Sequence, residues 1–164
     1  MKRRVLVALG SALVLLVMVM VLYPWPWLLV REGETLHYAF PGADGSVFTL
    51  RWRHSVELED WEERFVVHGE SILVDSTRFK TFGAGVPSHA GASTRLIDGW
   101  VEMDGIERIV DPLNVQAAAA EDYRLGYHGH VFALSHLGSH PILTFQVRRE
   151  PLIAVLPALL RPWY

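Results

Sequence analysis

Residues 47–67 read Val-Phe-Thr-Leu-Arg-Trp-Arg-His-Ser-Val-Glu-Leu-Glu-Asp-Trp-Glu-Glu-Arg-Phe-Val-Val. Apolar and polar side chains largely alternate at both ends of this stretch, and an acidic segment at 57–60 separates the two runs. Successive side chains of a β-strand point to opposite faces of the sheet, so the pattern predicts two paired strands with one apolar face.

The position of the turn sets which residues of the hairpin face each other. A tip at Leu58 and Glu59 would pair His54 with Glu63, the only polar pair on the apolar face. A carboxylate beside an imidazole favours the charged forms of both, so we expect the pair either to order the hairpin or to face a ligand or partner. The opposite face would carry a self-compensating set of charges: Arg51, Arg53, Glu62 and Arg64.

The same alternation, punctuated by glycine and proline turns, continues through most of residues 35–147. Short strands of this kind predict an all-β fold, a single antiparallel β-sandwich or partly open barrel. Residues 111–121 are ambiguous, because Asp111-Pro112 before an alanine-rich run is typical of a helix start, whereas alternating apolar residues suit a strand.

The first residues predict a membrane anchor. Residues 5–23 carry no charge and follow Lys2-Arg3-Arg4. About 20 apolar residues cross a bilayer, and basic residues before the span keep the N-terminus in the cytoplasm. We therefore expect contact with membrane lipid through residues 5–23, a single-pass protein of the cytoplasmic membrane, and a periplasmic or extracellular β domain.

The expected organisation is an anchor at 1–31, a β domain at 32–150 and an apolar tail at 151–164. Three of the 15 basic residues precede residue 5, which leaves 12 against 18 acidic residues beyond the anchor. An acidic domain is a poor partner for nucleic acid. The tail is too short to span a membrane and contains Pro157 and Pro162, so we expect it either to pack on the domain or to lie at the membrane interface.

No residue pattern predicts catalysis, a metal or a cofactor. Ser55 follows His54 directly, and adjacent strand residues point to opposite faces, so the two do not form a nucleophile and base. His128, His130, His136 and His140 lack a carboxylate partner at metal-binding spacing. The glycine-rich corner at 83–87 lacks the lysine and helix of a phosphate-binding loop.

Three motifs occur in order: His-Ser-Val-Glu at 54–57 with Glu63 nine residues after His54, Thr77-x-Phe79, and Gly-Ala-Gly-Val-Pro at 83–87. Over residues 46–147 the chain resembles the bacterial family called domain of unknown function eighteen-fifty. The acidic hairpin tip departs from the basic, proline-containing tip usual in that family. The resemblance marks, as ligand- or partner-binding candidates, His54, Ser55, Glu63, Thr77, Phe79, Gly83, Gly85 and Pro87.

The resemblance implies a small exported or anchored β protein that accompanies a tripartite ATP-independent periplasmic (TRAP) transporter of the TAXI type. We therefore expect a non-enzymatic accessory protein that contacts the transporter's membrane subunit or its solute receptor. The alternative is a module that binds an organic acid or amino acid in a pocket near His54 and Glu63.

Overall fold

The computed structural model describes residues 2–82 and 89–161 of the chain. An N-terminal helix leads into eleven strands and a short C-terminal helix. In chain order these elements are α1 (Lys2–Leu22), β1 (Pro24–Glu32), β2 (Thr35–Pro41), β3 (Val47–Arg53), β4 (Asp60–His68), β5 (Ser71–Phe79), β6 (Ser93–Ile97), β7 (Trp100–Ile109), β8 (Leu113–Gln116), η1 (Ala119–Glu121), β9 (Arg124–Tyr127), β10 (His130–Ala133), η2 (Ser135–Leu137), β11 (Ile142–Pro151) and α2 (Leu152–Leu159), where η1 and η2 are single 3₁₀ turns.

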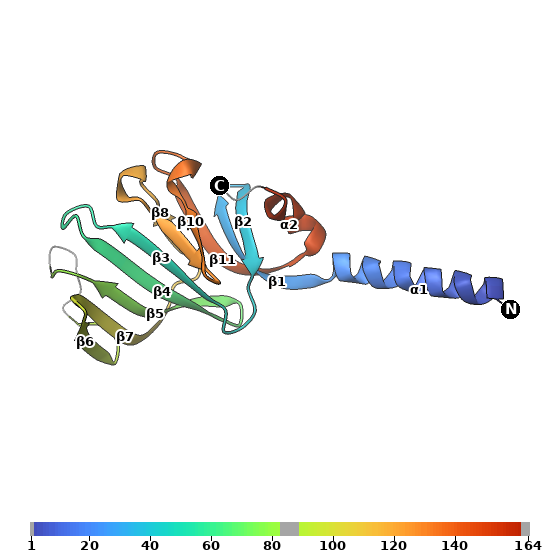
Figure 1. Cartoon of the computed structure of the whole chain (residues 1–164), viewed down its shortest axis with the longest axis horizontal. Coiled ribbons are helices and arrows are strands. Elements are labelled where there is room, and N and C mark those ends of the chain that lie inside the picture. The colour runs from blue at the N-terminus through green and yellow to red at the C-terminus, as the bar shows by residue number, and fades with distance from the viewer. Residues whose placement is uncertain (1, 83–88, 162–164) are drawn as a thin grey trace.

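The strands form two antiparallel sheets that pack face to face (Figure 1). The smaller sheet has the order β2-β1-β11-β8, and the larger has the order β10-β9-β3-β4-β5-β7-β6. The predicted all-β sandwich preceded by one apolar helix is therefore confirmed. Its main core lies between the sheets, where Phe48 stacks on Phe65 at 4.8 Å and on Phe145 at 5.8 Å between ring centroids.

Strand β1 is apolar on both faces because both are covered. Leu28 and Val30 belong to the core between the sheets, whereas Trp27 and Leu29 face outward and pack beneath α2. The sandwich thus begins at Pro24, and the boundary that the sequence predicted between anchor and β domain, at residue 31, falls inside β1. Strands covered on both faces read as continuous apolar runs, which explains why β1 resembles an extension of the anchor.

The hairpin of residues 47–67 forms with the predicted faces but with a different register. Its last pair is Arg53 with Asp60, so the connection contains six residues rather than a two-residue tip. Trp61 therefore faces Trp52, and Glu63 faces Leu50. Because the shift is by an even number of residues, the same side chains still point inward.

The ambiguous segment at 111–121 contains a strand and a helical turn. Leu113–Gln116 forms β8 at the edge of the smaller sheet, where Val115 pairs with Leu143 of β11, and the alanines that follow make the 3₁₀ turn η1. The first half of the segment is a strand despite the helical propensity of the alanines that follow it, because β8 pairs with β11 and covers part of the core.

Helix α1 projects from one end of the sandwich (Figure 1). Within Arg3–Leu22, an 18-residue window has a mean hydropathy of 3.0, and none of that window is buried by the rest of the chain. Its 21 residues extend roughly 30 Å, which matches the hydrocarbon thickness of a bilayer. The helix is thus long and apolar enough to cross a membrane.

Candidate functional site

Trp61 lies at the centre of the motif residues that the structure describes. Its indole Nε1 donates a hydrogen bond to Oγ1 of Thr77 at 2.7 Å, and its ring lies 5.2 Å from that of Phe79. The rings of His54 and Trp52 stack on Trp61 at centroid distances of 5.4 Å and 5.6 Å. We call these five residues the Trp61 cluster.

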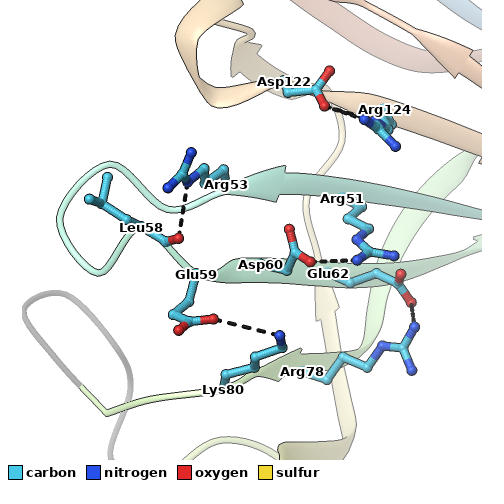
Figure 2. Close-up of polar contacts among 10 residues, drawn as sticks. All are labelled: Arg51, Arg53, Leu58, Glu59, Asp60, Glu62, Arg78, Lys80, Asp122 and Arg124. Carbon is cyan, nitrogen blue, oxygen red and sulfur yellow. Dashed lines mark hydrogen bonds and ion pairs between the residues drawn. The ribbon is translucent and has the colours of Figure 1, made fainter.

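His54 links this cluster to the loop at the end of the hairpin. Its Nδ1 accepts a hydrogen bond from the backbone N–H of Glu57 at 3.3 Å, so in the neutral ring the proton lies on Nε2. Leu58 has a left-handed backbone (φ 55°), held by a bond from its N–H to the carbonyl of His54. Arg53 Nε donates to the carbonyl of Leu58 at 3.0 Å (Figure 2), which closes the loop.

A cleft of about 460 Å³ opens beside this loop, and we call it the distal cleft. Its lining is mainly polar, and it comes from three connections that are distant in the sequence: the β3–β4 loop, the segment after β8, and the segment before β11. The lining residues are Arg53, His54, Ser55, Leu58, Gln116, Ala118, Ala120, Glu121 and His140.

The cleft and α1 lie at opposite ends of the sandwich. Pro151, the last residue of β11, pairs with Pro24, which follows α1 almost directly, whereas His140 of the cleft precedes the first residue of β11. A ten-residue strand is about 33 Å long, so the cleft lies roughly that far from the end of α1. Figure 1 shows the β3–β4 tip at the end opposite to α1.

The predicted pair of His54 and Glu63 does not form. The backbone of His54 bonds to that of Glu59, four residues before Glu63, and four residues of strand correspond to about 13 Å. The prediction was wrong because the loop is longer than a tight turn. The acidic side chain that shares the cleft with His54 is instead Glu121.

Glu63 lies on the inner face of the larger sheet, between Leu50 and Thr77 on the neighbouring strands. Burial raises the pKa of its carboxyl above the usual value, and the positive charge of Arg108 partly offsets this effect. Tyr123, which stacks on Trp52 at 5.3 Å, also has a raised pKa, mainly through burial and then through Glu121 and Glu63.

The outer face of the hairpin carries the predicted charges, but each pairs with a group outside the predicted set. Figure 2 shows Asp60 next to Arg51 and Glu62 next to Arg78. The nitrogen–oxygen distances of these two pairs are 2.5 Å and 2.8 Å. Lys80 lies 3.6 Å from Glu59. Arg51, Arg78 and Lys80 also surround the ring of Trp100, with the charged groups 4.9–5.9 Å from the ring centroid.

The remaining predicted residues fall into two groups. Ser55 lies in the lining of the distal cleft, whereas Gly83, Gly85 and Pro87 lie outside the described residues. Among residues 2–82 and 89–161, no three His, Cys, Asp or Glu side chains are grouped as metal ligands. The late histidines are dispersed, since His136 lies 3.2 Å from the hydroxyl of Tyr38 and His140 lines the cleft.

The chain matches one protein-family model. Residues 48–134, just over half of the chain, match the family described as Domain of unknown function (DUF1850). The chain belongs to this family. No curated protein and no solved structure matches the chain significantly.

The matched segment of this DUF1850 member covers the Trp61 cluster and all of the distal cleft except His140. The alternation in residues 47–67 puts Trp61 on the same face as Glu63, but nothing in the sequence marks Trp61 as the common neighbour of the motif residues. Gln116 and Glu121 were missed because the segment after β8 approaches the hairpin only in three dimensions. The one sequence signal for the site was the spacing of the motif residues, and the strand register explains part of it, since Trp61 pairs with Phe79 and Glu63 with Thr77.

Proposed function

We propose that this protein is a non-enzymatic accessory protein of a TAXI-type TRAP transporter, anchored in the cytoplasmic membrane by α1 with its β domain outside. The observation that carries the proposal is the separation of the two ends. An apolar helix of membrane-spanning length leaves one end of the sandwich, and a polar cleft opens at the other. Such a protein holds a recognition surface at a fixed height above the membrane.

The height of the cleft favours the solute receptor over the membrane subunit as its partner. Only Tyr23 lies between α1 and β1, so the sandwich begins at the membrane surface and the cleft stands about 33 Å beyond it. A transporter subunit embedded in the bilayer would contact the near end, whereas a soluble receptor reaches the far end. A mixed, charged lining with Arg53 and Glu121 suits a transient, electrostatically guided contact.

Co-purification of the tagged full-length chain in mild detergent tests this proposal. We expect the solute receptor and the membrane subunit of the transporter to be recovered together. Arg53→Glu should weaken receptor recovery by about tenfold, because it reverses a charge in the cleft lining. The matched control is Arg95→Glu, an exposed arginine on β6 of the same sheet but away from the cleft. Consistent absence of every transporter component would contradict the proposal.

Orientation needs its own measurement. The chain contains no cysteine, so a single cysteine at an exposed site reports the side of the membrane on which it lies. Val56→Cys, in the exposed hairpin loop, should react in intact cells with a thiol reagent that does not cross the inner membrane. Labelling only after cell lysis would place the β domain in the cytoplasm and would contradict the proposal.

A second candidate function, binding of a small organic acid or amino acid, is favoured by the composition of the cleft. Arg53 and the hydroxyl of Ser55 supply donors for a carboxylate, and Glu121 supplies an acceptor for an ammonium group. Thermal shift of the full-length chain against a panel of both ligand classes tests it. A shift that is lost in His54→Ala and kept in His128→Ala, at an exposed turn, supports this function; a flat response contradicts it.

A further inference from the structure

Helix α2 is apolar on all sides, which is unusual for a helix at a protein surface. One stripe packs on the smaller sheet, where Val155 and Ala158 are almost fully buried against Trp27, Leu29 and Ala39. The opposite side carries Ile153, Leu156 and Leu160, whose exposed fractions are 56%, 40% and 73%. A helix that is hydrophobic all round is expected inside a core or in contact with lipid.

The position of α2 indicates which of these environments covers its outer stripe. Helix α2 contacts α1, and Figure 1 shows it beside the junction between α1 and the sandwich. Met20 near the end of α1 and Leu152 at the start of α2 line one apolar hollow of about 350 Å³. The start of α2 therefore adjoins the last turn of α1.

Aromatic side chains at the same junction fit the boundary of a bilayer. Tyr23 and Trp25 are 47% and 42% exposed, and their rings contact each other at 4.8 Å. Trp25 Nε1 donates to the carbonyl of Met20 at 3.0 Å, which fixes this ring to the last turn of α1. Tyrosine and tryptophan concentrate at the membrane–water interface, so the end of α1 and the adjoining α2 lie at that depth.

We infer that α2 is an interfacial helix whose outer stripe of Ile153, Leu156 and Leu160 inserts into the leaflet from which α1 emerges. The inference rests on α1 spanning the membrane, as proposed above. Interfacial helices place an apolar face about 5–10 Å into the boundary between headgroups and acyl chains. Leu152, at the start of α2, shares an apolar hollow with Met20, which puts α2 beside the last turn of α1. Lipid contact at α1 and α2 together then fixes the tilt of the sandwich and keeps the distal cleft pointing away from the membrane.

Depth-dependent fluorescence quenching tests this inference on the full-length chain. Because the chain lacks cysteine, Leu156→Cys or Ile153→Cys provides a single attachment point for an environment-sensitive fluorophore. The labelled protein is placed in phosphatidylcholine nanodiscs with and without lipids that carry a quencher on the acyl chain. Both positions are exposed, so neither label disturbs the packing of α2 on the sheet.

Two further positions serve as controls. Val14→Cys in α1 reports whether the anchor is inserted, and Leu96→Cys, an apolar residue 75% exposed on β6, reports a surface away from the membrane. We expect quenching at Val14, Ile153 and Leu156, at least about twofold stronger than at Leu96. Quenching at Val14 with none at Ile153 and Leu156 would overturn the inference while leaving the anchor intact, and would favour a protein partner for this face. No quenching at Val14 would overturn both.

Discussion

The two ends of the sandwich differ in chemistry although β11 runs from one to the other. At the end next to α1, the outer stripe of α2 and the aromatic junction expose apolar side chains. At the far end, loops from three parts of the chain converge on a polar cleft next to a stacked aromatic cluster. The strands thus separate an end with an exposed apolar surface from an end with a polar cleft, and the proposed function rests on this separation.

The largest expected effect is a loss of stability when the Trp61 cluster, next to the distal cleft, is disrupted. Trp61→Ala should destabilise the protein by about 3–5 kcal/mol, because it removes a buried ring that contacts the other members of its cluster. Chemical denaturation of the full-length chain in detergent measures the loss. Trp61→Phe, which retains a ring but loses the hydrogen bond to Thr77, should cost about 1 kcal/mol. Equal losses for the two variants would contradict a role for ring packing.

The next effect concerns the end of the sandwich next to α1. Val155→Thr should cost about 1–3 kcal/mol, because an isosteric hydroxyl is buried between α2 and the smaller sheet. Ile153→Thr on the exposed stripe of the same helix is the control and should change the free energy of unfolding by no more than about 0.5 kcal/mol in detergent. The opposite ranking would mean that α2 does not pack as the structure has it.

The pH dependence of stability tests the effect of burying Glu63, which lies between the two ends of the sandwich. Burial raises the folded-state pKa of Glu63 above its usual 4.5, so its destabilising effect is absent below pH 4.5 and develops as pH rises through the folded-state pKa. Glu63→Gln should therefore match the parent below pH 4.5 and unfold at a higher temperature at neutral pH. A lower melting temperature of the variant at neutral pH would show that attraction to Arg108 outweighs burial.

The smallest effect is expected on the charged outer face. A double-mutant cycle on Arg51 and Asp60 should give a coupling energy of about 0.2–1 kcal/mol, since both side chains are more than a third exposed. The coupling should weaken with added salt, as surface ion pairs do. A salt-independent coupling of several kcal/mol would mean that this pair is shielded from water by another part of the protein.

The amino-acid sequence was sufficient to predict the fold class, an N-terminal helix of membrane-spanning length and the faces of the hairpin. These features depend on local periodicity: an uninterrupted apolar run long enough to cross a bilayer, and alternation that assigns each strand residue to one face. The inward orientation of Trp52, Trp61 and Glu63 survived an error in the turn, because a shift by an even number of residues preserves the face.

The contacts between residues that are distant in the sequence depend on tertiary packing. The six-residue connection separates His54 from Glu63 and brings His54 onto Trp61, and no local signal fixes the length of a loop held by its own hydrogen bonds. Glu121 reaches the cleft because β8 pairs with β11 across a long stretch of sequence. Strand β1 looked like a continuation of the anchor for the same reason, since burial on both faces depends on α2, more than a hundred residues away in the chain.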